Sequence, residues 1–290
     1  MTREEMIRQA KETRRQVTNA SVEPELLAAY AAEVTLRKIP TRSGDSDVYD
    51  TVHDNVKSGG PLIINLHGGG FIRERTPNDE VFCRRLVHGL NLRVWDVDYR
   101  VAPDYPFPAA LHECYDVVKW AYDHGEELGI DSGKIILTGH SAGGNLICGI
   151  CIMAHESGDF QIPLAVIEYP PLDLYTDPAD KKKMGEGIHY ERARLYNLYY
   201  CDRQQQKDPL VSPVFAPEDM LRDFPKTLMI TAGQDDLCLE AEAFALKLAQ
   251  AGNEVTLKRF PGVGHAFTIY RRPKCEEAME LIIRFLRNNI

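Results

Sequence analysis

The hydrophobic positions of the chain form short runs that predict β-strands. The first run alternates apolar with polar residues, and most later runs are nearly continuous, as in strands buried on both faces. Eight strands are predicted in this way, at 34–39, 48–53, 62–66, 94–99, 135–138, 164–169, 227–231 and 255–260.

Between the strands, apolar residues recur three or four positions apart, which is the spacing of one helix face. Helices are expected around 110–121, 142–153, 237–248 and 281–286. Strands that alternate with helices of this length imply βαβ units. We therefore expect an α/β fold in a single domain over residues 1–290, with a mostly parallel eight-stranded sheet and helices on both faces.

Two segments depart from this rhythm and are expected to form a small helical cap. Residues 1–30 resemble a charged helix, and 177–209 is polar and too long for a tight connection. The lysines at 181–183 are interpreted as a solvated face. The second segment is rich in tyrosine, which could line a pocket or pack against the body of the protein: Tyr190, Tyr196, Tyr199 and Tyr200.

Composition and charge exclude several classes of protein. Of 290 residues, 44% are apolar and 27% charged, which excludes wholesale disorder. The net charge of −9 argues against nucleic acid or an anionic membrane as partner. No apolar stretch could span a membrane, and the charged start predicts no secretory signal. Seven scattered cysteines indicate reduced thiols, hence a cytoplasmic protein.

A serine lies on a predicted sharp turn between a strand and a helix. Residues 139–144 read Gly-His-Ser-Ala-Gly-Gly, which is the G-x-S-x-G nucleophile elbow. Side chains two residues before and after Ser141 would clash in such a turn, so Gly139 and Gly143 are required. The alternative is a glycine-rich βα turn or a phosphate-binding loop. The strand before and the helix after Ser141 favour the elbow.

A second glycine-rich motif follows the strand at 62–66. Residues 67–71 read His-Gly-Gly-Gly-Phe, and bare backbone at Gly68, Gly69 and Gly70 can approach a ligand closely. Its N–H groups can point at a developing oxyanion, as in lipases and esterases. The alternative is a flexible turn before a helix near 79–88. His67 is expected to brace this loop.

A serine nucleophile needs an imidazole base and a carboxylate that orients it. His265 follows Gly262 and Gly264 in a loop just past the last strand, whereas His140 is expected to point away from its neighbour Ser141. Asp235 and Asp236 follow the strand at 227–231, and Asp236 would fit equally well as a helix N-cap. We prefer Asp235, because the order serine, acid, histidine then holds with each residue beyond a strand's carboxyl end.

With these motifs, residues 60–290 resemble the hormone-sensitive-lipase-like carboxylesterases of the α/β-hydrolase superfamily. The run Asp-Tyr-Arg-Val-Ala-Pro at 98–103 and Ser-Pro at 212–213 belong to the resemblance. It implies the α/β-hydrolase fold and a turn at Tyr99 and Arg100 that braces the glycine loop. It also implies a triad of Ser141, Asp235 and His265, and an oxyanion hole formed by the N–H groups of Gly69, Gly70 and Ala142.

The sequence departs from the family in three places. His140 replaces the usual aspartate before the serine, and Asp236 replaces the usual proline after the acid. The N-terminal cap is short, which suggests a more open pocket.

The expected function is hydrolysis of small-molecule esters through an acyl-enzyme intermediate. The small cap suggests short acyl chains, from acetyl to butyryl. No metal or cofactor is expected, because neither H-E-x-x-H nor G-x-G-x-x-G occurs. Cys148 and Cys151 match C-x-x-C, but inside a helix they are interpreted as packing.

Two alternatives to the esterase stay open. The first is an amidase or peptidase that uses the same triad. The second is a non-catalytic binding protein on this scaffold, which the presence of His265 disfavours. The sequence does not distinguish a monomer from a homodimer.

Overall fold

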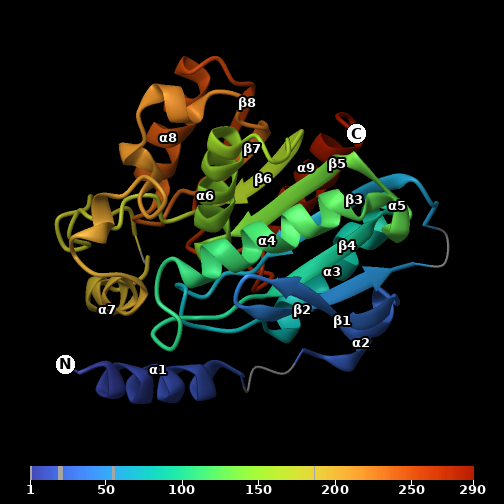
Figure 1. Ribbon diagram of the computed structural model, residues 1–290. Coiled ribbons are helices and arrows are strands. Elements are labelled where there is room, and N and C mark those ends of the chain that lie inside the picture. Colours follow the sequence, from blue (N-terminus) through green and yellow to red (C-terminus); the bar gives the residue numbers. More distant parts are fainter. Residues whose placement is uncertain (1, 19–21, 54–55, 186) are drawn as a thin grey trace.

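The computed structural model describes residues 2–18, 22–53, 56–185 and 187–290 and contains one eight-stranded sheet (Figure 1). The strand order is β1-β2-β4-β3-β5-β6-β7-β8. All neighbours from β4 to β8 pair in parallel, and β1 with β2 and β2 with β4 pair antiparallel. The strands are β1 (Glu33–Thr41), β2 (Gly44–Val52), β3 (Gly60–Leu66), β4 (Arg93–Asp98), β5 (Ile130–His140), β6 (Leu164–Glu168), β7 (Lys226–Ala232) and β8 (Val255–Phe260).

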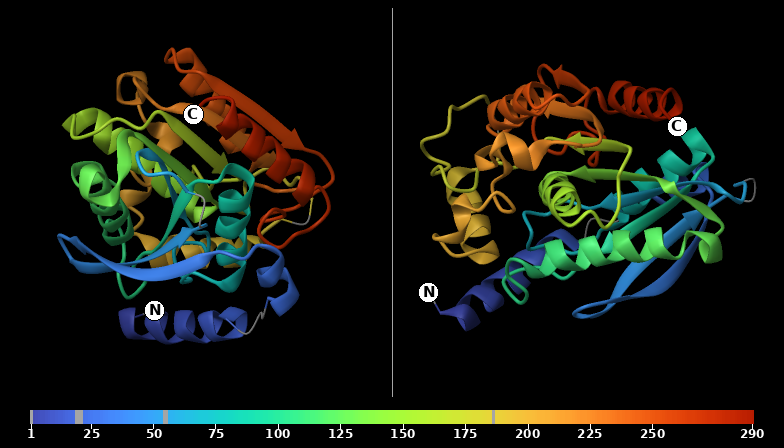
Figure 2. Two further views of the ribbon diagram at one scale, coloured as in Figure 1. Left: turned by 90° about the vertical axis from the view of Figure 1, so that its right-hand side faces the viewer. Right: turned by 45° about the horizontal axis from the view of Figure 1, so that its top comes forward.

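Helices cover both faces of the sheet, as the sequence predicts (Figures 1 and 2). The α-helices are α1 (Arg3–Thr18), α2 (Pro24–Ala29), α3 (Pro77–Leu90), α4 (Ala109–Asp123), α5 (Gly125–Leu128), α6 (Ala142–Ser157), α7 (Tyr190–Tyr200), α8 (Cys238–Gln250) and α9 (Cys275–Arg287). Three short 3₁₀ turns are η1 (Gln205–Lys207), η2 (Pro213–Phe215) and η3 (Glu218–Leu221).

The core is divided between the two faces of the sheet. In β3, Leu62, Ile64 and Leu66 pack with α4, α6 and α8, whereas Ile63 packs with α3 and α9. Successive side chains of a strand point to opposite faces, so a strand between two helix layers must be apolar at every position. This explains the continuous apolar runs, and the predicted fold class is confirmed.

The N-terminal segment contains two helices, where the sequence suggests one charged helix over 1–30. On α1, Ala10 is buried in the core and Gln9 accepts a hydrogen bond of 2.8 Å from the Tyr199 hydroxyl. The N-terminal helix therefore lies against α7, as the two views agree (Figures 1 and 2).

The segment 177–209 is less helical than predicted. Among the described residues of this segment, only α7 and η1 are helical, and residues 177–184 form turns and irregular backbone. The prediction of a solvated lysine run is wrong for Lys181. Its ammonium group pairs with the largely buried carboxylate of Glu240 and donates a bond of 2.7 Å to the Asp173 carbonyl.

The helix that follows the elbow is almost wholly buried. Cys148 and Cys151 lie inside α6, are buried and are free thiols, in agreement with the packing interpretation. Burial raises the pKa of both thiols. Among the helices of the described residues, none is long and apolar enough to cross a membrane.

Candidate active site

Ser141 stands on a strained turn between β5 and α6. Its backbone has φ 53° and ψ −121°, a conformation that costs a side-chain-bearing residue free energy and persists only when surrounding contacts enforce it. The turn brings α6 so close to β3 that a Cβ at Gly143 would lie 1.9 Å from the Leu66 carbonyl oxygen. The glycine requirement inferred from the G-x-S-x-G motif therefore has a direct steric cause here.

Three of the predicted residues form one hydrogen-bonded chain. The Nε2 atom of His265 lies 2.9 Å from Ser141 Oγ, and its Nδ1 lies 2.6 Å from Asp235 Oδ2. Asp235 is fully buried, and its other oxygen accepts a bond of 3.2 Å from the Leu237 N–H. With Asp235 ionised, Nδ1 carries the proton, and Nε2 is left free to accept from the serine hydroxyl.

Asp236 has a different environment from Asp235. It accepts a hydrogen bond of 2.8 Å from the Met184 N–H and pairs with Lys183 at 2.9 Å. Its carboxylate therefore holds the segment before α7 instead of facing His265. The suggestion that Asp236 could cap the next helix is wrong, because α8 begins at Cys238 after Leu237.

The backbone amides of the glycine loop are available to a ligand. Among the described residues, the N–H groups of Gly69, Gly70 and Ala142 donate to no protein acceptor. Gly69 and Gly70 line the same cavity as Ser141, and Ala142 begins α6 directly after it. A Cβ at Gly70 would lie 2.4 Å from the Tyr196 ring, so the backbone there approaches α7 as closely as glycine permits.

The run at 98–103 braces the glycine loop, as the resemblance implies. The Tyr99 hydroxyl donates a hydrogen bond of 2.7 Å to the His67 carbonyl, and the two rings stack with centroids 4.1 Å apart. The Ala102 N–H donates 2.8 Å to the Phe71 carbonyl. Arg100 pairs with buried Glu113 on α4 at 3.0 Å and thereby fixes the turn to the body.

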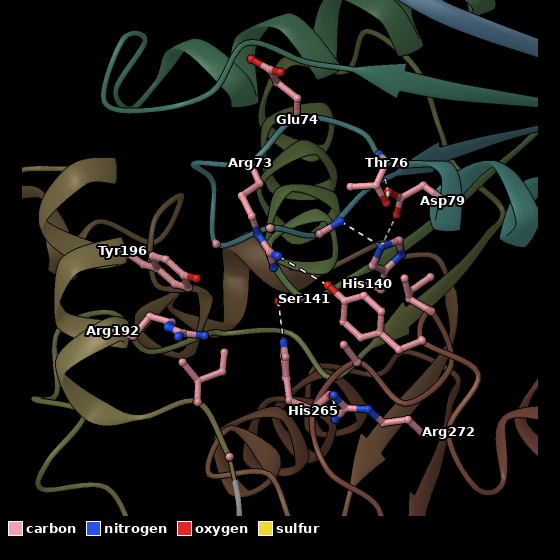
Figure 3. Close-up of a pocket in the computed structure, with 18 of the residues that line it drawn as sticks. Arg73, Glu74, Thr76, Asp79, His140, Ser141, Arg192, Tyr196, His265 and Arg272 are labelled. Carbon is pink, nitrogen blue, oxygen red and sulfur yellow. Dashed lines mark hydrogen bonds and ion pairs between the residues drawn. The ribbon is translucent and has the colours of Figure 1, made fainter. Parts of the chain in front are cut away.

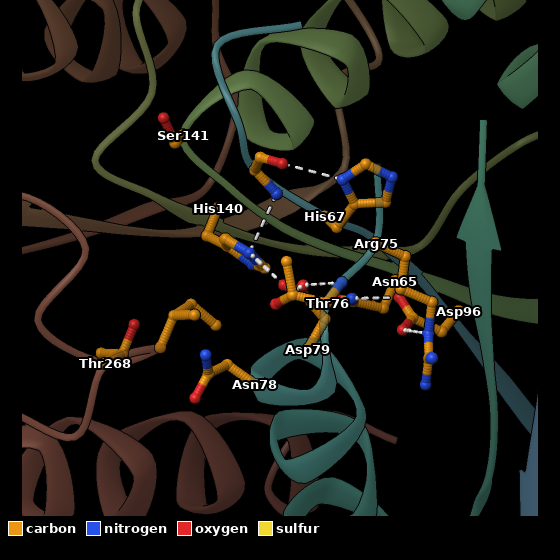
Figure 4. Close-up of polar contacts among 12 residues, drawn as sticks. Asn65, His67, Arg75, Thr76, Asn78, Asp79, Asp96, His140, Ser141 and Thr268 are labelled. Atoms are coloured by element: carbon orange, nitrogen blue, oxygen red, sulfur yellow. Dashed lines mark hydrogen bonds and ion pairs between the residues drawn. The ribbon is translucent and has the colours of Figure 1, made fainter. Parts of the chain in front are cut away.

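His140 lies in the site, although we expected it to point elsewhere. Its side chain turns away from Ser141 but lines the same cavity and reaches Asp79 of α3, with Nε2 2.9 Å from Asp79 Oδ1 (Figure 4). The Gly68 nitrogen lies 2.9 Å from that same Nε2 atom. The His140 ring therefore lies between the glycine loop and the start of α3. These elements are distant from His140 in the sequence, so the sequence did not predict this position.

The carboxylate of Asp79 joins two elements. Its second oxygen accepts a bond of 2.8 Å from the Thr76 N–H and so caps α3. Burial alone would raise the pKa of Asp79, but the hydrogen bond and positive charge of His140 lower it below its usual range. Beside this pair, the Asn65 amide donates a hydrogen bond of 2.7 Å to Asp96 (Figure 4), and Asn65 Oδ1 accepts one of 3.0 Å from the Thr138 hydroxyl.

Two cavities of different size meet at Ser141. The larger has a volume of about 510 Å³ and opens between the glycine loop, α7 and the loop that carries His265 (Figure 3). The smaller, of about 50 Å³, lies beside Phe71, Leu174 and Ile188. Ser141, Gly70, Ile188 and Tyr196 line both. A substrate bound across Ser141 would thus place a small part in one cavity and a larger part in the other.

The four tyrosines divide between the two roles considered for them. Tyr196 forms cavity wall, whereas Tyr199 and Tyr200 are buried and Tyr200 stacks on Phe71 with centroids 3.8 Å apart. Tyr190 faces the charged groups of Lys183 and Arg194. The sequence analysis missed Arg73 and Arg192, which also line the larger cavity and stand in no recognisable motif.

Comparison with known proteins agrees with this geometry. A family model described as alpha/beta hydrolase fold matches residues 63–269. The chain belongs to the alpha/beta-hydrolase family. The resemblance to its hormone-sensitive-lipase-like carboxylesterases is confirmed by similar proteins named as esterases.

Members of the family share both sequence and fold with the chain. An arylesterase of Saccharolobus solfataricus is 32% identical over 211 residues, which cover 71% of this chain and 68% of that protein. An ethyl acetate hydrolase of Pseudomonas putida is 29% identical, covering 89% and 83%. The solved esterase of Pyrobaculum calidifontis superposes with a TM-score of 0.86 at 29% identity, covering 98% and 96%.

Proposed function

We propose that this chain is a serine carboxylesterase that hydrolyses esters of short acyl chains, acetyl to butyryl, through an acyl-enzyme intermediate. The observation that carries the proposal is the hydrogen-bonded chain from Asp235 through His265 to Ser141, with distances of 2.6 and 2.9 Å. Its esterase relatives support the class of reaction. The chain is a carboxylic ester hydrolase, and we infer the residue roles and the acyl range from the contacts and cavities at Ser141.

The first half of the reaction forms the acyl-enzyme. The Ser141 oxygen attacks the ester carbonyl carbon while His265 Nε2 takes its proton, and Asp235 stabilises the imidazolium. The carbonyl oxygen gains negative charge and is met by the N–H groups of Gly69, Gly70 and Ala142. Each such donor contributes about 3–4 kcal/mol of transition-state stabilisation. His265 then protonates the leaving alcohol as the carbon–oxygen bond breaks.

The second half releases the acid. A water molecule gives its proton to His265 and attacks the acyl carbon, and the same three amides hold the oxyanion again. His265 returns a proton to Ser141 as the acid leaves.

The proposed acyl range comes from the smaller cavity. A cavity needs about 10–15 Å³ for each water-sized group, so the volume of about 50 Å³ accepts about four such groups. An acetyl to butyryl chain has that size. Phe71, Leu174 and Ile188 give the cavity apolar walls, which suits an alkyl chain.

Three further predictions concern the cap, the location in the cell and the oligomeric state. Residues 1–30 and 177–209 act as the cap that limits substrate size, with α1 and α7 as its helices. The protein is cytoplasmic, which cell fractionation would test. A homodimer, as opposed to a monomer, would be recognised by light scattering of the purified protein.

The direct test is labelling by a fluorophosphonate, which reacts with an activated serine. The wild-type protein should be labelled, whereas Ser141→Ala and wild type blocked with an ester-derived inhibitor should not. Hydrolysis of p-nitrophenyl esters should be fastest from acetate to butyrate and fall for longer chains. Rates that rise toward long chains would contradict the small acyl site.

A matched ester and anilide separate the esterase from an amidase or peptidase. Because the triad chemistry does not choose the leaving group, both substrates should carry the same acetyl group and differ only in the scissile bond. The esterase proposal requires the ester to be cleaved and the anilide to remain essentially intact. Faster cleavage of the anilide would favour the amidase.

A further inference from the structure

The larger cavity contains arginines that have no carboxylate partner among the residues that the structure describes. Elsewhere in the protein, arginines such as Arg75, Arg93 and Arg259 are paired with acids at 2.5 Å or less. Among the described residues, neither Arg73 nor Arg192 forms an ion pair. In a chain whose net charge is −9, two unpaired guanidinium groups at one site need an explanation.

Arg73 is the more buried of the two. It follows the glycine loop directly, and its N–H donates to the carbonyl of Gly69 at 3.2 Å. Its Nε atom is buried without a hydrogen-bond partner among the described residues, and its Nη1 reaches Tyr270 only at a long 3.4 Å. A half-buried guanidinium group whose buried Nε makes no hydrogen bond costs free energy that a ligand anion would offset.

Arg192 approaches from the other side of the cavity. It projects from the first turns of α7, and the guanidinium groups of Arg73 and Arg192 both point into the space beside Ser141 (Figure 3). Since Arg73 follows the glycine loop and Arg192 lies in the proposed cap, an anion between them would contact both walls of the cavity.

The described acids around this cavity do not pair with the arginines. The Asp79 carboxylate is occupied by His140 and Thr76. Glu74 is exposed, and its carboxylate points away from Ser141 (Figure 3). Arg272 lies at the rim, where it donates 3.3 Å to the His265 carbonyl and adds further positive charge.

We propose that the preferred ester of this enzyme carries a carboxylate on its alcohol half, held in the larger cavity by Arg73 and Arg192. A guanidinium group presents paired N–H donors that match a carboxylate in geometry and charge. The alcohol half is assigned because the acyl half fills the smaller, apolar cavity, where Lys181 is already paired with Glu240. This inference rests on the proposed esterase function.

A matched pair of substrates tests the charge preference. We choose 4-acetoxyphenylacetate, an anion at neutral pH, and 4-acetoxyphenylacetamide, its neutral counterpart of nearly equal size. The methylene group separates the charge from the phenol, so both esters have similar leaving groups. Wild type should hydrolyse the anion with a kcat/KM about tenfold higher, as expected when charged hydrogen bonds are made.

Variants assign this preference to the two arginines. Arg73→Gln and Arg192→Gln should each lower the ratio of the two kcat/KM values several-fold, and the double variant should bring it close to 1. Arg222→Gln, at an exposed arginine outside both cavities, should leave the ratio unchanged. Arg73 adjoins the glycine loop, so Arg73→Gln could slow hydrolysis of both esters equally, and such a loss cancels in the ratio of the two kcat/KM values. If Arg73→Gln does not fold, the ratio measured for Arg192→Gln, a change at an exposed residue, tests the inference.

Direct binding distinguishes failure of this inference from failure of the esterase proposal. Calorimetry should show that Ser141→Ala binds the anionic ester about tenfold more tightly than its neutral counterpart, 4-acetoxyphenylacetamide. If wild type hydrolyses both esters equally and Ser141→Ala binds them equally, the carboxylate inference is wrong and the esterase proposal stands. If neither ester is hydrolysed, the esterase proposal fails, and the calorimetric preference still decides the carboxylate inference.

Discussion

Asp235 and Asp236 are adjacent in the sequence, but their carboxylates have different contacts and different roles. Both follow β7, yet one carboxylate turns into the protein toward His265 and the other turns out to Lys183 and Met184. Successive side chains on a tight turn project in different directions, so the sequence alone does not tell which acid faces His265. The contacts in the structure distinguish the two acids, and replacing each acid by its amide tests this assignment.

Asp235→Asn should lower kcat on a short-chain acetate ester about 10⁴-fold. The amide can present its NH₂ group to Nδ1 and thereby stabilise the tautomer in which Nε2 carries the proton, which cannot accept from Ser141. Asp236→Asn, the matched control, should keep kcat within about threefold, because it changes only the contacts to Lys183 and Met184. Steady-state kinetics measures both, and a large loss in Asp236→Asn with little loss in Asp235→Asn would reverse the assignment.

His140 and Asp79 should behave as one unit in unfolding experiments. Both are buried and face each other, so His140→Ala removes the ring that faces the Asp79 carboxylate, and Asp79→Asn removes the charge that faces the ring. Each change should destabilise the protein by about 3 kcal/mol. The double variant should lose much less than the sum, because it leaves no unpaired charge. Urea denaturation of the four proteins gives the coupling, and strictly additive losses would mean that the pair does not interact.

At the scale of elements, α1 connects pieces that are distant in the sequence. Arg14 donates hydrogen bonds of 2.6 Å to the Ile72 carbonyl and 2.7 Å to the Ala102 carbonyl, and it pairs with Asp104 at 2.8 Å. Ile72 lies in the turn that begins at Gly69, where its N–H donates to the Gly69 carbonyl. The N-terminal helix therefore fixes the backbone that would carry the oxyanion donors.

Arg14→Ala should reduce kcat about tenfold with a smaller effect on thermal stability. The loss follows because a displacement of even about 1 Å in the oxyanion donors is costly for the reaction. Arg8→Ala on the same helix is the control, since Arg8 is exposed and forms no hydrogen bond or ion pair with another described residue. Equal rates for both variants and wild type would show that α1 does not position the loop.

The elements differ in how far the sequence predicts them. All eight strands and the helices packed on them follow from apolar periodicity, because burial on a sheet imposes that pattern. The elbow at Ser141 can be predicted from its glycines, because larger side chains at those positions would clash with neighbouring backbone. The irregular stretch before α7 is fixed instead by long-range contacts, such as Lys181 with Glu240, which leave no local pattern.

The candidate site divides in the same way. Ser141, Asp235 and His265 could be placed because each follows a strand in an expected order. His140, Arg73 and Arg192 could not, since their surroundings come from α3, the glycine loop and α7, which meet only in the folded chain. An arginine outside any motif has no sequence signal that distinguishes a cavity from the surface, and the nucleophile-elbow motif does not specify what the side chain at position 140 contacts.

At the scale of the whole molecule, Glu168 links the stability of the fold to pH. It ends β6 in the centre of the sheet, and its backbone carbonyl accepts a bond of 2.8 Å from the Ser141 N–H. Its side chain is fully buried, and both oxygens lack a hydrogen-bond partner among the described residues. Burial raises the pKa of Glu168 to about 7, against the opposing effects of His140 and of the neighbouring Thr268 hydroxyl.

The raised pKa of Glu168 fixes the direction of the pH dependence. The folded protein holds this proton up to about pH 7, whereas the unfolded chain releases it near the ordinary value of 4.5. The stability that the protonated form provides is therefore complete below the unfolded value and is lost as pH rises through about 7. A difference of this size corresponds to about 3 kcal/mol once the group is ionised in both states.

Glu168→Gln should remove this dependence, because the amide stays neutral at every pH. Its melting temperature should match wild type near pH 5 and exceed it by several degrees near pH 9, as measured by thermal denaturation. Glu218→Gln, at an exposed glutamate of η3, should follow the wild-type curve. Parallel curves for wild type and Glu168→Gln would show that Glu168 is ionised in the folded protein at neutral pH, with His140 as its counter-charge.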